Sequence, residues 1–394
     1  MKKLRQILTI LAICATPVAV RAQEFKLFNQ SFQVHGFVSQ GFVGTNQNNW
    51  LTMNTSSGSL AMTDVGANIS TQIADKFRVG AQVYDRDIGK LGKWHPHLDY
   101  AYGDYRFESW LGVRVGKIKT ALGLYNDTQD MESLHTWAIM PQAVYPLDLR
   151  TTNLAHTGGD LYGAIPLRKG GRLDYTLYYG LKSDDRYDGW YYSNADIDYP
   201  VYRIVGRMGG ADLKWTSPLS GLTLGGSLSE QRDHWDGYLT LENDEPYLYY
   251  TPGKWLGAAY IDYQKGKWQF TSEYLHDHEI GQMNVYGGPV FTPYPYGYTG
   301  WYVSAAYRVN RRLQVGAYDS QYEFLGIPAT DHCFDRTITA RVDLNRFWDV
   351  KVEGHFINGN GGAEEGAAHG FYLFDNPTLH HDTNALVLRT GFSF

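Results

Sequence analysis

The sequence has no long run of apolar residues beyond its first twenty or so positions, and this absence limits how the chain can meet a membrane. A membrane-spanning helix needs about 20 consecutive apolar residues, and no such window follows residue 22. The mean hydropathy of −0.39 is also too polar for a helical membrane protein. Helical spanning is therefore excluded, but a barrel is not, because only alternate residues of its strands contact lipid.

Cysteine and charge are scarce as well. The chain has two cysteines, Cys14 and Cys333, and only 19 % of its residues are charged. The formal net charge is −6, and the N-terminal leader carries only positive charges, so the rest of the chain is more acidic still. This balance argues against a nucleic-acid partner. What the sequence has in quantity is 31 Tyr, 11 Trp and 43 Gly, a composition that suits short aromatic-rich strands joined by many turns.

The N-terminus has the three parts of a secretory signal peptide. Lys2, Lys3 and Arg5 are its positive region, Ile7 to Ala15 its short apolar region, and Val20-Arg21-Ala22 its cleavage site. We therefore expect residues 1–22 to be a signal peptide and residues 23–394 to form the exported domain. Removal of the leader leaves Cys333 alone, which excludes an internal disulfide framework.

Hydrophobic residues alternate with polar ones in many segments. From Trp348 to Phe356 every even position is apolar or Gly and every odd position is ionisable. In a strand this pattern gives one apolar face and one charged face. Segments of this kind recur about sixteen times, each long enough to cross the hydrocarbon layer as a tilted strand. Closure into a barrel follows, because a sheet edge facing lipid would leave its backbone groups unpaired.

The sequence therefore predicts an all-β fold, a transmembrane antiparallel β-barrel of sixteen strands. The strands are expected near 31–43, 61–73, 76–87, 98–108, 110–120, 158–166, 172–182, 202–216, 221–233, 255–264, 267–277, 300–309, 312–320, 335–344, 347–357 and 383–394. Tight turns alternate with long connections at 44–60, 121–157, 183–201, 234–254, 278–299 and 358–382. Short periplasmic turns and long external loops are typical of outer-membrane barrels.

Three stretches resemble the sixteen-stranded porins of Gram-negative bacteria. They are Val34 to Phe42, Arg114 to Asn126 and the final strand Leu386 to Phe394. The resemblance implies that Phe392 and Phe394 belong to the terminal signal read by the barrel-assembly machinery, that the barrel forms a homotrimer, and that the loop after the fifth strand, 121–157, folds inward to constrict the pore. The constriction signature best known in that family is absent, so its individual residues cannot be aligned.

Loop 121–157 has two features that fit an inward position. It carries Asp127, Asp130 and Glu132, followed by a rather apolar run from Leu134 to Pro146 that water would not favour. Alternation also points four arginines into the lumen from neighbouring strands, and we expect them to form one basic wall opposite these acids. The four are Arg78, Arg86, Arg106 and Arg114. The alternatives are that the loop covers a subunit interface or caps the barrel, and that the arginines pair with Asp104.

Other candidate sites are weaker. Ser227 lies in an expected strand without a His and an acid tied to it, so an outer-membrane enzyme is a minor alternative. The histidine pairs at 95 and 97, 276 and 278, and 380 and 381 have metal-compatible spacing but fall at the rim, where imidazoles are ordinarily solvated. Acidic loop residues could bridge divalent cations to lipopolysaccharide. An aromatic slide for sugars could use Trp190, Tyr191, Tyr192, Tyr247, Tyr249 and Tyr250.

The function expected from these observations is passive diffusion of small hydrophilic solutes through a water-filled pore in the outer membrane. The expected surroundings are outer-membrane lipid and lipopolysaccharide, and no catalytic residue, cofactor or metal is expected. A sugar- or ion-selective channel and a plugged structural barrel are the alternatives. The sequence does not name the solute or the charge selectivity of the pore.

Overall fold

The computed structural model describes residues 23–27, 30–182, 184–187, 191, 201–239, 245–285, 290–325, 332–359 and 379–394. The expected signal peptide lies outside these residues. The strands are β1 Gln23–Leu27, β2 Gln30–Thr45, β3 Met62–Ala74, β4 Phe77–Ile88, β5 His97–Glu108, β6 Leu111–Lys119, β7 Ala155–Pro166, β8 Arg172–Lys182, β9 Val201–Thr216, β10 Leu222–Leu239, β11 Glu245–Lys265, β12 Trp268–Val285, β13 Val290–Arg308, β14 Leu313–Leu325, β15 His332–Asp343, β16 Trp348–Asn358 and β17 Asp382–Ser393. Short helical turns lie at η1 Glu132–Leu134, α2 Arg150–Leu154 and η2 Arg168–Gly170.

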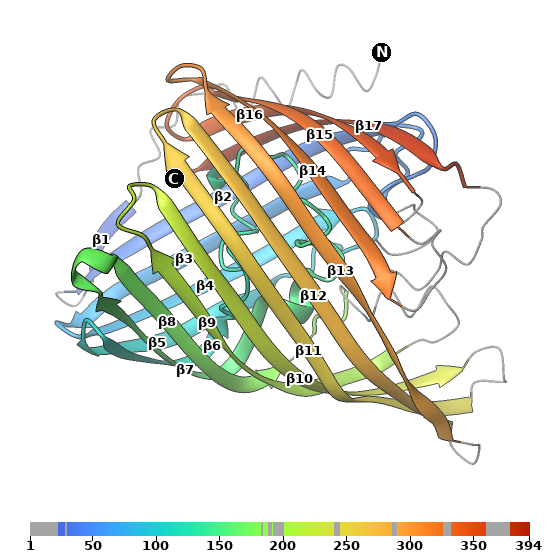
Figure 1. The fold of residues 1–394 in the computed structure, drawn as a ribbon, viewed down its shortest axis with the longest axis horizontal. Helices are drawn as coiled ribbons and strands as arrows, with labels where there is room; N and C mark the ends of the chain where they lie inside the picture. Colours follow the sequence, from blue (N-terminus) through green and yellow to red (C-terminus); the bar gives the residue numbers. More distant parts are fainter. Residues whose placement is uncertain are drawn as a thin grey trace.

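Strands β2 to β17 form a closed barrel of sixteen antiparallel strands, as the alternation predicted (Figure 1). Each strand pairs with the next in the sequence, and β17 closes the ring by pairing with β2 from Ser393↔Phe37 to Ala385↔Thr45. The short strand β1 was not predicted. It pairs with the first residues of β2, from Gln23↔Val34 to Leu27↔Gln30, where β17 no longer reaches.

The strand ends at the tight turns agree with the predicted ones, but some opposite ends differ. The segments 234–254 and 278–299 were expected to be long loops, yet β10 continues to Leu239 and β12 to Val285. Their partners β11 and β13 begin at Glu245 and Val290. These expectations were wrong because antiparallel backbone pairing extends beyond the length needed to span lipid, and hydropathy alone does not mark where it stops.

The alternation in β16 has the predicted consequence. Val352 and Phe356 are 46 % and 52 % exposed on the outer surface, whereas Lys351, Glu353 and His355 are fully buried. The same parity holds around the ring, and its outward members are large apolar side chains such as Ile69, Val115, Leu177, Leu213, Leu228 and Ile338. This outer surface suits a hydrocarbon environment, and the inner surface collects the polar residues. Among the described residues, no helix is long and apolar enough to cross a membrane.

The end of the barrel that bears the tight turns also holds the C-terminus. Gly36 N donates to Phe394 O at 3.2 Å, and Phe394 N donates to Gly36 O at 3.0 Å. The Phe394 ring lies directly over Gly36, where a Cβ would come within 2.8 Å of it. Phe392 packs near Phe347, with ring centroids 6.3 Å apart. The two residues of the expected assembly signal therefore lie on the barrel seam, in an aromatic group at the rim; their role in assembly stays a prediction.

Candidate functional site

The segment between β6 and β7, residues 120–154, lies inside the barrel (Figure 1). Its backbone bonds to side chains on the inner faces of distant strands. Leu124 N donates to Glu273 of β12, Ala138 N donates to Glu353 of β16, and Arg389 of β17 donates to Ala138 O at 2.6 Å. These partners surround the lumen, so the segment crosses it. The structure therefore folds the loop after the fifth barrel strand inward, and neither a surface cap nor a subunit contact describes it.

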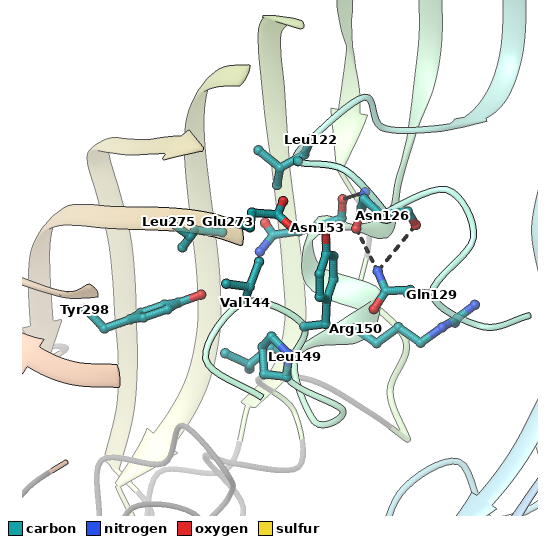
Figure 2. A pocket seen from close by; sticks show the side chains of 13 residues that line it. Leu122, Asn126, Gln129, Val144, Leu149, Arg150, Asn153, Glu273, Leu275 and Tyr298 are labelled. Atoms are coloured by element: carbon teal, nitrogen blue, oxygen red, sulfur yellow. Dashed lines mark hydrogen bonds between the residues drawn. The ribbon is translucent and has the colours of Figure 1, made fainter. Parts of the chain in front are cut away.

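The start of this segment turns sharply against β10 and β12. Gly123 has φ = +65°, and a Cβ there would collide with the Glu273 carboxylate. Gly123 N donates to Ser227 Oγ at 2.8 Å, and Leu124 N donates to Glu273 Oε1 at 2.8 Å. Tyr145, later in the segment, donates its hydroxyl to Glu273 Oε2 at 2.6 Å. Leu122 and Glu273 come together in the narrow cavity drawn in Figure 2. A residue without a side chain is needed here because the backbone meets a carboxylate.

The middle of the segment is held to β16 by a clamp, which we define as Glu132, Ala138 and Ile139 of the segment with Lys351 and Glu353 of β16. Lys351 Nζ lies 2.5 Å from Glu132 Oε1 and donates to Trp137 O at 3.0 Å. Ala138 N and Ile139 N each donate to a Glu353 oxygen at 3.0 Å. Burial would raise the pKa of Glu132, but Lys351 and then Arg389 outweigh it and hold that pKa below its usual value.

A second anchor fixes the two ends of the segment to each other. Asp130 accepts from Lys119 Nζ at 2.6 Å, and Arg150 lies 3.5 Å from Asp130 and 2.9 Å from Asp99 of β5. The Arg150 guanidinium also lies 4.0 Å from the Tyr84 ring centroid. Burial would lower the pKa of Arg150, but Asp99 and the other anions around it hold that pKa above its usual value. Asp99 can take part because the β4–β5 ladder shifts register beside it, so that Asp99 and the next residue both reach the lumen.

The apolar residues of the segment fill part of the lumen. Trp137, Ile139, Val144 and Tyr145 are buried, as their composition predicted. Ile139, Val144 and Tyr145 belong to one cluster with Trp50, Leu51 and Met53 of the connection between β2 and β3. The strands that contribute to this cluster are β2 to β4 and β11 to β17. Strands β5 to β9 contribute nothing to it among the described residues, and the lumen beside them stays open.

The open part of the lumen is a hollow of about 370 Å³ between residues 118–127 and the inner faces of β5 to β9. We call it the hollow. Its polar lining consists of Tyr100, Tyr102, Arg114, Lys119, Thr120, Asn126, Asp127, Asp160, Thr176, Asp212 and Lys214. Arg114 is held at 3.1 Å by Asp104 and lies 4.3 Å from the Tyr162 ring centroid. Groups of both charge signs thus face one another across water-accessible space.

The four predicted arginines do not form one basic wall. Arg78 and Arg114 are both cross-strand partners of Asp104, which lies between them on β5. Arg86 is buried and donates to Leu147 O at 2.7 Å, and Arg106 is exposed beside a tight turn. The expectation of a single wall was wrong because it counted the inward cations of β4 to β6 without the inward acid among them. Pairing of Arg114 with Asp104, the alternative, is what the structure has.

The three predicted acids also separate. Asp127 is exposed and lines the hollow, whereas Glu132 is buried in the clamp and Asp130 in the second anchor. Asp130 and Glu132 do not face the predicted arginines, since Lys119 and Arg150 neutralise Asp130 and Lys351 neutralises Glu132. The sequence reading missed four residues that matter here: Asp160, Asp212, Lys214 and Lys351. Each of them occupies an inward position in the alternation of its strand, and this could have identified it as a lumen residue. The alternation does not tell which of them the inserted segment covers.

The weaker candidates find ordinary places. Ser227 Oγ donates to Asp212 at 2.7 Å and has no histidine partner in the described lumen. His95 stacks on Tyr187, and His276 lies near Thr299 on the outer surface. The described residues include no group of three or more metal-ligating side chains arranged for an ion. Of the expected aromatic slide, Trp190 and Tyr192 lie outside the described residues, as do the side chains of Tyr247, Tyr249 and Tyr250.

Comparisons with known proteins show the fold. No protein-family profile matches the sequence, and no curated protein matches it either. Among solved structures, in-vitro folded OmpT, an outer membrane protein of Vibrio cholerae, has a TM-score of 0.57 at 9 % identity over 95 % of this chain and 100 % of that chain. An anion-selective porin from Comamonas acidovorans has a TM-score of 0.57 at 9 % identity, over 93 % of this chain and 100 % of its own. Salmonella typhi OmpF, solved with daunomycin, has a TM-score of 0.54 at 12 % identity, over 94 % and 100 %. The chain is a porin-like barrel, and with its apolar outer face it is a protein of the outer membrane.

Proposed function

We propose that the protein is a pore for passive diffusion of small hydrophilic solutes, with the hollow as the narrow part of its path. The observation that carries this proposal is that the inserted segment leaves the lumen beside β5 to β9 open. A plugged structural barrel would bury this wall, as the segment buries the wall of β15 to β17. The exposed Asp127 and the polar wall opposite it give a solute hydrogen-bonding groups in place of its hydration shell.

Channel recordings on the purified protein test this function. Steady ohmic steps are expected, and an absence of conductance would contradict the proposal and favour a plugged barrel. The path is located by placing single cysteines in a Cys333→Ala background. A bulky thiol reagent should reduce the current when Asp127→Cys lines the hollow, whereas Val352→Cys on the outer face is the matched control and should leave it unchanged. Equal effects at both positions would show that the solute path lies elsewhere.

A saccharide-selective channel is a second candidate, favoured by the tyrosines of the hollow. Tyr100 and Tyr102 lie side by side, with ring centroids 5.6 Å apart, and both line the hollow. Aromatic faces bind the apolar faces of sugar rings. Concentration-dependent block of the current by maltose, lost in Tyr100→Ser, would favour this function over general diffusion. If maltose does not change the current, general diffusion is the function that the recordings support.

The assembly of the protein also belongs to this proposal. By resemblance, we infer a homotrimer embedded in outer-membrane lipid and lipopolysaccharide and inserted by the barrel-assembly machinery through Phe392 and Phe394. Native mass measurement in mild detergent tests the trimer, and a monomer alone would contradict it. Phe394→Asp should lower the outer-membrane yield because it removes the aromatic ring from the seam over Gly36. Normal insertion of this variant would show that the ring is not the signal.

A further inference from the structure

The outer surface of β13 to β16 carries two charged residues among apolar neighbours that face lipid. Asp319 of β14 has the same parity as Val315, and Arg336 of β15 has the same parity as Ile338; Val315 and Ile338 are both exposed on the outer surface. Their neighbours in sequence, Tyr318 and Thr337, are buried on the inner face, so Asp319 and Arg336 belong to the outer face. Asp319 and Arg336 are direct cross-strand partners.

Both charges lie at the depth of the hydrocarbon layer. Asp319 is six residues beyond Leu313, the first residue of β14, which corresponds to about 20 Å along a strand. At the usual tilt of an outer-membrane barrel this places it about 15 Å above the turn, inside an apolar band that is about 25 Å tall. Charged side chains that face lipid at this depth are destabilising and need partners.

Neither charge has found a partner within the described part of the chain. No hydrogen bond or ion pair joins Asp319 to Arg336 or to any other described residue, and Asp319 Oδ1 is buried without a donor. The Arg336 side chain is exposed. An uncompensated carboxylate and an uncompensated guanidinium therefore stand side by side on a surface that lacks water to solvate them.

The surface around the two charges is hollowed rather than ridged. A groove of about 470 Å³ lies there, with the small residues Ala305 and Ala317 in it and the larger Val303, Ile338 and Phe356 along it. Gly354 continues the row of small residues on β16, opposite Ile338. Small residues permit close approach of two protein surfaces in a membrane, where packing and polar contacts drive association in place of the hydrophobic effect.

We propose that this face, β13 to β16, is a contact between two copies of the chain related by a two-fold axis along the membrane normal. A two-fold contact brings the same patch of both copies together, so that residue i meets residue j and j meets i. Adjacent opposite charges are self-complementary under that symmetry, because Asp319 of each copy meets Arg336 of the other. The groove lets the two walls approach closely enough for both ion pairs to form away from lipid.

This contact uses one part of the barrel wall and does not depend on conduction. The hollow lies on the inner faces of β5 to β9, so this proposal is independent of the proposed pore. A trimer closed by head-to-tail contacts would join two different faces, whereas this face pairs with itself. The remaining wall stays available for other contacts.

Charge-reversal variants in two differently tagged copies test the contact. Asp319→Arg gives the face two positive charges, and Arg336→Asp gives it two negative charges. Each variant alone should lose at least tenfold in cross-linking between two copies that carry Ala317→Cys in a Cys333→Ala background, a readout of this face that a trimer joined through other faces does not supply. Co-expression of the two variants should restore association, because opposite charges then meet across the two-fold axis. The double variant in a single chain should also associate normally.

Two outcomes would overturn the proposal. If the two single variants fail to rescue each other while the double variant behaves normally, the charges pair within one chain and the face is not an interface. If neither variant changes association, the charges are covered by lipid. Val115→Asp, a new charge on the outward face of β6, is the matched control and should leave association unchanged. Resistance of each variant to unfolding by unheated SDS, seen as an unchanged electrophoretic mobility, verifies that each barrel has folded.

Discussion

The two parts of the lumen wall use the same kinds of residue in opposite ways. Along β15 to β17 the inserted segment covers the wall, and the charges there form buried pairs such as Lys351 with Glu132 and Arg389 with Asp64. Along β5 to β9 the segment covers only the part of the wall where it binds Asp99 and Lys119, and beside that part Asp127 and Lys214 face the hollow. The contrast shows that an inward charge in this barrel acquires its role from the segment in front of it. Covered charges hold the segment, and uncovered charges meet the solute.

The largest expected effect comes from breaking the covered side. Glu132→Gln leaves Lys351 buried with a weakened partner set, and removal of one member of a buried pair costs on the order of 3 kcal/mol. We expect a corresponding loss in the free energy of unfolding, measured by denaturant titration of the barrel in detergent. We also expect noisier single-channel currents, since the segment loses one of its attachments to β16.

Asp127→Asn is the matched control for that experiment, because it removes a carboxylate from the same segment at an exposed position. Its free energy of unfolding should stay within about 0.5 kcal/mol of the parent value, as for most exposed substitutions. Equal losses of unfolding free energy in the two variants would show that the covered acid does not stabilise the protein more than the uncovered one.

The second effect concerns His135, a buried imidazole next to the clamp. Its Nε2 lies 2.9 Å from Thr128 O, and burial lowers the pKa of His135 to about 4. A released segment would have the ordinary value of about 6.5. Below pH 6.5 the imidazole of a released segment is protonated, whereas the buried imidazole stays neutral. The stability of the clamp therefore falls as the pH drops from about 6.5 towards 4. At pH 5 the loss is at most about 2 kcal/mol.

The variant His135→Gln keeps a hydrogen-bond donor and cannot titrate. It should flatten the pH dependence of the unfolding free energy between pH 7 and 5, whereas His95→Gln on an outer connection should not. Glu132 does not interfere in this window, because its pKa is held below the usual value and its contribution is lost only at lower pH. If His135→Gln and the parent had the same pH dependence of unfolding free energy, His135 would not be held neutral.

The sequence was sufficient for the barrel but not for the division of its lumen. Alternation such as that from Trp348 to Phe356 reports directly which side chains face lipid, since the solvent on each side of the wall dictates polarity. The strand number followed from this alternation, whereas the inward segment was expected from the resemblance to sixteen-stranded porins and from the apolar run after Leu134. The strand ends away from the tight turns did not, because pairing beyond the membrane leaves no hydropathy signal.

The charges of the lumen show a deeper limit. Parity alone placed Arg86 and Arg114 on the same inner surface, yet Arg86 binds Leu147 of the segment and Arg114 faces the hollow. Which residue is covered depends on the path of residues 120–154 through the lumen. That path is set by contacts between positions more than 200 residues apart, such as Lys351 with Glu132. The cross-strand pairing of the outward Asp319 and Arg336 likewise became visible only with the strand register.

The smallest expected effect concerns ion selectivity, and it tests the uncovered side. Of the three predicted acids, Asp127 remains exposed to the hollow, so Asp127→Asn by itself should alter ion selectivity. One charge in a watery passage is worth about 1 kcal/mol to an ion about 4 Å away. The permeability of each ion should therefore change by no more than about fivefold, the cation downwards and the anion upwards, so that the ratio of cation to anion permeability falls by no more than about thirtyfold, measured from the reversal potential in a salt gradient. Lys214→Gln, on the opposite wall of the hollow, should shift the ratio the other way. Screening by salt should shrink both shifts as the ionic strength rises. If neither variant moved the reversal potential while Glu132→Gln did, the ions would pass through the covered side, and the roles assigned to the two walls would have to be exchanged.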